Sequence, residues 1–188
     1  MNELAINFRS GAAIPSKEYQ DEGVPYVRIK DMKNGSISID DAVYVSEDFA
    51  TINISNKAIL QNENILISRV GTIGKSAFVT KELEGSVTNQ HITIIQVDKN
   101  KLLPEYFNFY MQTPWAIEQL EQKATGAAQQ FIRLKDIKEL KVPVPELEEQ
   151  QAIVSDISKQ LQLNSDKELQ EEIISFTKKL LQQDSTRH

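Results

Sequence analysis

Five short stretches of the chain have the hydrophobic and β-branched composition of strands, and turn residues separate them. In the first of them we expect Val27 and Ile29 to lie on one face and the polar side chains on the other. Asn34-Gly35 comes next and indicates a tight turn between antiparallel strands. The predicted strands cover residues 26–30, 36–39, 63–70, 75–80 and 91–98.

A helical pattern occupies residues 102–124. Pro104 suits the first turn of a helix, whereas Pro114 should divide the segment into two helices. The large side chains within it recur at helical spacing, so we interpret them as core residues. They are Tyr106, Phe107, Phe109, Tyr110 and Met111. Residues 134–140 predict a further short helix or turn.

The last segment, residues 146–188, contains no glycine or proline and has apolar residues at intervals of three and four. Such intervals are typical of a coiled-coil seam, with one slip of register in the middle. One long helix or two helices satisfy the pattern equally. The predicted seam consists of Val154, Ile157, Leu161, Leu169, Ile173, Phe176 and Leu180.

Pro143 and Pro145 mark the clearest boundary in the chain, because they force an extended and stiff segment. We therefore expect a domain over residues 1–145 and a helical dimerisation or spacer region over residues 146–188. A stiff linker should hold the helix away from the domain, so we expect its seam to pack against another molecule. The alternative is a helix that folds back onto its own domain.

Composition narrows the class of protein. The 188 residues contain no cysteine and two histidines, which excludes disulfides, thiolate metal sites and histidine-rich metal sites. No apolar run approaches the length of a membrane helix, and the first residues do not resemble a signal peptide, so we expect a cytosolic protein. The net charge is −6. Residues 146–188 carry nine acidic and five basic residues, so residues 1–145 are close to neutral.

Gly74-Lys75-Ser76 resembles the end of a Walker A phosphate loop. That motif needs a glycine where this chain has Arg69, and it needs a helix where residues 76–80 predict a strand. The two glycines, Gly71 and Gly74, instead suit a loop between two strands. A nucleotide-binding enzyme remains an alternative, and it predicts ATP binding that is lost on Lys75→Ala.

Several segments, taken in order, resemble the DNA specificity subunit of type I restriction–modification systems, and more closely one half of it. They cover most of residues 8–153 and read FRSGAAIPSKEYQDEGVPYVRIKDMKNGSI, NILISRVGTIGKSAFV, NQHITIIQV, LLPEYFNFYMQTP and TGAAQQFIRLKDIKELKVPVPELEEQQAI. The resemblance implies an α+β target-recognition domain with a mixed sheet and packed helices, followed by a long coiled-coil helix.

The resemblance also implies that this chain is not an enzyme. S-adenosylmethionine and ATP would be bound by its partners, a modification (methyltransferase) subunit and a restriction subunit. Family members normally carry two recognition domains, whereas the VRIKDM-like and LISRVGTIGK-like segments each occur once here. The chain is thus expected to be a half-subunit or a truncation product. As a half-subunit it would form a homodimer on double-stranded DNA with a bipartite target.

DNA recognition needs cations for phosphates and forked donors or amides for base edges. Each candidate also has a structural interpretation: a tight turn for the glycine loop, a cap for Asn89, and solvated side chains for the rest. The candidates are Arg28, Lys30, Lys33, Arg69, Thr72, Lys75, Asn89, Gln90, His91, Gln129, Gln130 and Arg133. A protein-interaction module, in which the coiled coil is the whole function, is the main alternative.

Overall fold

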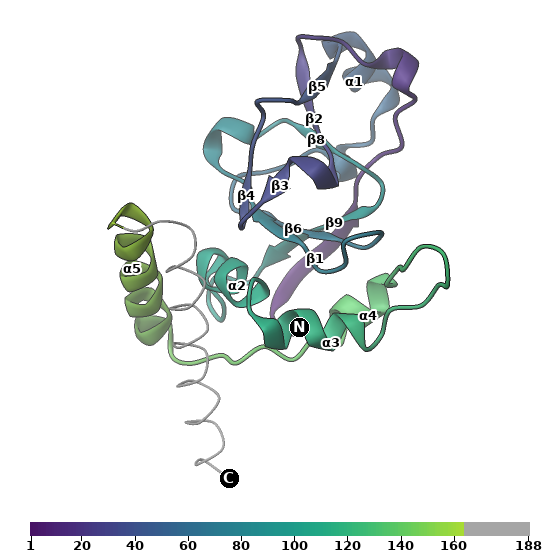
Figure 1. The fold of residues 1–188 in the computed structure, drawn as a ribbon. Helices are drawn as coiled ribbons and strands as arrows, with labels where there is room; N and C mark the ends of the chain where they lie inside the picture. The colour runs from purple at the N-terminus through teal and green to yellow at the C-terminus, as the bar shows by residue number, and fades with distance from the viewer. Residues whose placement is uncertain (164–188) are drawn as a thin grey trace.

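The computed structural model describes residues 1–163, which form an α+β fold, as the sequence predicts (Figure 1). Its main sheet is antiparallel and has the strand order β1-β9-β6-β7. Successive side chains of β9 point to opposite faces of this sheet. Both faces are covered, so these side chains enter two buried clusters, one on each face. These strands are β1 (Ala5–Ser10), β6 (Ile65–Ser68), β7 (Ser76–Phe78) and β9 (Ile92–Val97).

A second, smaller sheet lies on the side of the main sheet away from the helices α2 (Pro104–Met111), α3 (Pro114–Glu121) and α4 (Leu134–Lys138) (Figure 1). Its central strand, β2, pairs with β5 in antiparallel orientation and with β8 in parallel orientation. Ser46 caps the helix that follows, since its side chain accepts a hydrogen bond from Phe49 N. The elements are β2 (Val24–Val27), β5 (Val43–Val45), β8 (Val87–Thr88) and α1 (Glu47–Asn53).

The first predicted strand is wrong beyond Val27. Arg28 is instead the N-cap of a 3-10 turn, Ile29–Asp31, and Asp31 accepts a hydrogen bond from Arg28 N. The Asn34-Gly35 turn is confirmed: Asn34 has φ of 48°, and the turn joins a short antiparallel pair. That hairpin consists of β3 (Met32–Lys33) and β4 (Ser36–Ile37); the other 3-10 turns are Ser16–Glu18, Asn56–Ala58 and Lys81–Leu83.

The predicted helices are confirmed, including the break between the first two. Pro104 and Pro114 each occupy the first turn of a helix, and the Thr113 side chain caps the second helix by accepting from Ala116 N. The helices are α2 (Pro104–Met111), α3 (Pro114–Glu121) and α4 (Leu134–Lys138).

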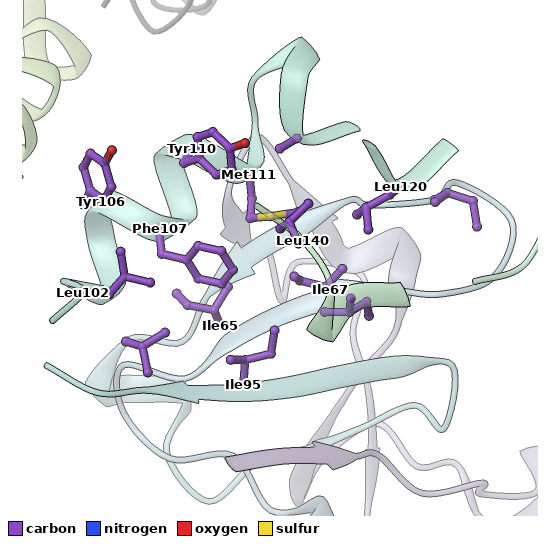
Figure 2. Close-up of a cluster of buried hydrophobic side chains, with 14 of the residues drawn as sticks. Ile65, Ile67, Ile95, Leu102, Tyr106, Phe107, Tyr110, Met111, Leu120 and Leu140 are labelled. Atoms are coloured by element: carbon purple, nitrogen blue, oxygen red, sulfur yellow. The ribbon is translucent and has the colours of Figure 1, made fainter. Parts of the chain in front are cut away.

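The main hydrophobic core lies between α2 and the main sheet. Figure 2 shows Phe107 from α2 beside Ile65 of β6, and both are fully buried. Tyr106, Tyr110 and Met111 are buried in the same cluster, so the aromatic residues of this segment pack in the core, as predicted. Each buried side chain of this size stabilises the folded state by roughly 1.5–3 kcal/mol relative to the same side chain left exposed.

The expectation that the C-terminal helix stands away from the domain is wrong for its first part. Helix α5 (Leu147–Leu163) packs against α2. Its Ile153 and Ile157 are buried in the core cluster, and Val154 packs against it, so Val154 and Ile157 do not form an open seam. Leu161 is 44% exposed. Leu169, Ile173, Phe176 and Leu180 lie outside the described residues.

Candidate nucleic-acid interface

The loop that joins β6 to β7 is closed by one buried serine. Ser68 Oγ donates to Thr72 O and accepts from Lys75 N at 2.9 Å, while Gly74 N donates to Ser68 O. Gly74 has φ of 74°, and a Cβ there would lie 3.0 Å from Ile117, so this position requires glycine. The loop leads into a strand rather than a helix, which removes the geometry of a Walker A site.

Arg69 is the best-placed cation of this loop. One of its terminal nitrogens donates to Gln90 O at 2.7 Å, and its backbone N–H donates to His91 O. Within residues 1–163 no carboxylate forms a salt bridge with it. Burial lowers the pKa of Arg69, but an arginine side chain does not lose its proton in a protein near neutral pH, so the guanidinium is charged. The site therefore holds a positive charge without a counter-ion in the described chain.

A third segment, residues 125–131, lies beside this loop. Thr125 and Phe131 exchange backbone hydrogen bonds, and every residue between them is exposed. Gly71 N donates to Gln130 O, and Ile132 N donates to Arg69 O, so backbone bonds join the two loops. The side chains of Gln129 and Gln130 consequently remain available to a partner.

We call residues 69–75, 89–91 and 125–133 together the loop cluster. Gln90 and His91 precede β9, and Arg69 follows β6; Ser68 pairs with Ile92, so these residues share one end of the main sheet. An open hollow of 360 Å³ adjoins the cluster and reaches the hairpin tip. Residues that line it include Asn34, Thr72, Lys75, Gln112 and Gln130.

The remaining candidates divide into available and engaged side chains. Lys30, Lys33 and Thr72 are exposed, as is His91, whose Nε2 forms a hydrogen bond with Gln90 Nε2 at 3.1 Å. Lys75 Nζ donates to Ile29 O at 3.1 Å, which uses one of its three N–H groups.

Two candidates have structural roles instead. Asn89 donates to the Tyr26 hydroxyl and accepts from His91 N, so the interpretation as a cap holds for this residue. Arg28 binds the Asp31 carboxylate and donates to Asp41 O at 2.7 Å. Its guanidinium is therefore engaged within the chain, and we leave it out of the interface.

Sequence reasoning missed two features. Phe131, 43% exposed, is a large apolar side chain within the loop cluster. The segment IRLKDI (132–137) repeats the local pattern of VRIKDM (27–32), so that segment does have a short second copy. In both, an arginine caps a helical turn and an aspartate three residues later accepts from its backbone N–H. The signal was the shared R-x-K-D spacing.

The described residues offer no group of three or more His, Asp or Glu side chains that would hold a metal ion. Among residues 1–163 no helix has the length and apolar character needed to cross a bilayer.

Comparison with known proteins places this geometry in a family. The model of the type I restriction modification DNA specificity domain matches residues 3–175. The EcoBI specificity subunit of Escherichia coli is 24% identical over 144 residues, and the MjaIX specificity subunit of Methanocaldococcus jannaschii is 27% identical over 175. These matches cover 77% and 88% of this chain, but 30% and 38% of the relatives, so the chain spans about a third of their length.

Solved structures agree on the fold. The S subunit from M. genitalium matches with a TM-score of 0.60 at 19% identity, covering 84% of this chain and 36% of that one. The HsdS subunit from Thermoanaerobacter tengcongensis matches with a TM-score of 0.63 at 16% identity, covering 86% and 40%. Because the family match covers residues 3–175, the chain belongs to the family of type I restriction modification DNA specificity domains.

Proposed function

We propose that this chain recognises a specific DNA sequence and, as a homodimer, directs the methyltransferase and restriction subunits of a type I system to a bipartite target. The observation that carries the proposal is the loop cluster, where Arg69 has no counter-ion among residues 1–163 and Gln129 and Gln130 project from an exposed loop. The chain itself performs no catalysis in this proposal. S-adenosylmethionine and ATP are bound by the partner subunits.

The side chains divide by chemistry into two roles. Arg69, Lys75 and Lys33 contact phosphates, because they are cations without an ion-pair partner in residues 1–163. Gln129 and Gln130 contact base edges, since an amide can pair with adenine through two hydrogen bonds. The backbone bonds between the two loops support this division, because they hold the loops without using these side chains.

The first test measures affinity for a selected duplex as a function of salt, with the modification subunit present. Arg69→Ala is expected to weaken binding by about tenfold and to reduce the salt slope by about one, since one phosphate contact is lost. Lys99→Ala is the control. Lys99 follows the other end of β9, whose six residues span about 20 Å at the usual rise per strand residue, and forms a salt bridge with Glu63.

Equal losses in the Arg69 and Lys99 variants would contradict the placement of the interface. An absence of duplex binding by the parent protein, together with intact dimerisation, would instead favour an interaction module that does not read DNA.

A further inference from the structure

Residues 141–146, the linker between the domain and α5, are held by side chains. Tyr110 donates its hydroxyl to Lys141 O at 2.8 Å, and Tyr106 donates to Pro143 O at 2.9 Å. Gln150 Nε2 donates to Pro145 O at 2.8 Å. In an extended chain, the carbonyls of residues two apart are separated by about 6.6 Å. Residues four apart in a helix are separated by about 6 Å, so the spacing of Tyr106 and Tyr110 on α2 fits the spacing of the two linker carbonyls that they bind.

Gln150 joins three parts of the chain. It is fully buried, and its Oε1 accepts from Leu103 N at 2.8 Å. Its Nε2 donates to Lys101 O at 2.9 Å as well as to Pro145 O. Leu103 is the N-cap of α2, so a side chain of α5 satisfies a backbone N–H at the start of that helix. The first turn of α5 is thus tied to the start of α2.

Buried apolar contacts continue the attachment along the helix. Ile153 and Ile157 of α5 lie in the same core cluster as Leu102 and Tyr106, at or near α2. A tilt of α5 would expose these side chains and would break the hydrogen bonds of Gln150. Because the linker has proline at two of its six positions, its own backbone also offers little freedom.

We propose that Gln150, supported by Tyr106, is a positioning residue that fixes the direction in which α5 leaves the recognition domain. The loop cluster and α5 then turn as one rigid body. The consequence for DNA rests on the proposed function: if two copies pair through their C-terminal segments, this joint sets the distance and phase between the two half-sites. One base pair changes that distance by about 3.4 Å and the phase by roughly 34°.

The direct test measures a distance across the joint in the full chain without DNA. The chain has no cysteine, so Ser36→Cys on β4 and Lys159→Cys on α5 give two unique spin-label sites, both exposed. The labelled chain is mixed with excess unlabelled chain, so that pairs within one copy dominate. The parent should give one narrow distance distribution.

Gln150→Met keeps the side-chain volume but removes all three hydrogen bonds, and it should broaden or shift the distribution. Gln151→Met, on the exposed neighbouring residue, is the control and should leave the distribution narrow. If Gln150→Met fails to fold, Tyr106→Phe removes one linker bond while keeping the ring in the core. An unchanged distribution in both Gln150→Met and Tyr106→Phe would overturn the proposal, and where Gln150→Met does not fold, an unchanged distribution in Tyr106→Phe alone would overturn it.

A second measurement tests the consequence for DNA. Duplexes are selected from a pool in which both the half-sites and the spacer length vary. Gln150→Met should select the same half-site bases as the parent, with about tenfold weaker preference for one spacer length over its neighbours. An equally sharp spacer preference would contradict the positioning role. If the parent selects no bipartite site, the proposed function fails, and the label distances alone decide whether the joint is rigid.

Discussion

The two R-x-K-D segments have almost the same sequence but lie in different surroundings. In both, the arginine caps a turn and the aspartate is buried: Asp31 is 4% exposed and Asp136 is 3% exposed. The arginines differ. The Arg28 side chain is 20% exposed and also binds a distant carbonyl, whereas the Arg133 side chain is 55% exposed.

This difference separates what local sequence determines from what the surroundings determine. The capping box requires residues three apart, so the same four-residue pattern produces it twice. Whether the guanidinium is available to DNA depends on the neighbouring segment, which is residues 40–42 for Arg28 and the exposed loop 125–131 for Arg133. The first segment contacts the loop cluster through the bond from Lys75 Nζ to Ile29 O, and the second overlaps the cluster, where Ile132 N donates to Arg69 O.

The largest expected difference between the two segments is in the free energy of unfolding that each loses when its arginine is replaced by alanine. Arg28→Ala should lower the free energy of unfolding by about 2–3 kcal/mol, because it leaves a buried carboxylate with two hydrogen bonds fewer and no charge partner. Arg133→Ala should lower it less, by about 1 kcal/mol, because the Arg133 side chain is 55% exposed and makes one hydrogen bond to its aspartate where Arg28 makes two. Urea unfolding of both variants measures these values.

DNA affinity should show the reverse order. Arg133→Ala should weaken duplex binding by about three- to tenfold, as expected for one phosphate contact. Arg28→Ala, measured where it is fully folded, should bind as the parent does. A larger loss of affinity in Arg28→Ala than in Arg133→Ala would show that the structural assignment of Arg28 is wrong.

The fold could be predicted wherever the signal is local. Pro104 and Pro114 identified two helix starts, and Asn34-Gly35 identified a hairpin. The end of β2 was missed because strand alternation continues through Arg28, and the bond from Arg28 N to the Asp31 side chain leaves no sign in that alternation. The packing of α5 depends on Gln150 reaching Leu103, 47 residues away, and no periodicity reports such a contact.

A smaller effect is expected in the way that the stability of the cap at Arg133 and Asp136 depends on pH. Burial favours the neutral acid, but hydrogen bonds from the backbone and side chain of Arg133 outweigh it, so the pKa of Asp136 lies below its ordinary value of 3.8. A lowered pKa in the folded state adds stability above the unfolded pKa, and that stability disappears as the pH falls through the folded pKa.

Asp136→Asn should therefore lower the free energy of unfolding by about 1 kcal/mol near neutral pH, and the difference from the parent should shrink below about pH 4. Asp156→Asn is the control, because that carboxylate is exposed on α5. A difference between the parent and Asp136→Asn that stays constant from neutral to acid pH would show that the ionised carboxylate does not stabilise the cap.

The types of side chain at the candidate site could be predicted from the sequence, but their arrangement in space could not. Arg69, Thr72, Lys75, Gln90 and Gln130 were singled out from three separate segments, and the structure brings those segments together. Phe131 was missed because an isolated aromatic residue normally indicates core packing, and only its exposure distinguishes it. The engagement of Arg28 could not be foreseen, because its second partner, Asp41 O, lies 13 residues further along the chain.

If the loop cluster reads DNA sequence, as we propose, selection of duplexes from a random pool should show it. The measurement compares the parent with Gln129→Ala/Gln130→Ala, with the modification subunit present in both cases. Both glutamines are exposed and make no side-chain bond within residues 1–163 that would stabilise the fold. The account predicts that the variant still binds duplex but loses discrimination at one or two base pairs of each half-site, by about 1–3 kcal/mol per contact. Enrichment of the same sequence, with the same discrimination at every base pair, would contradict it.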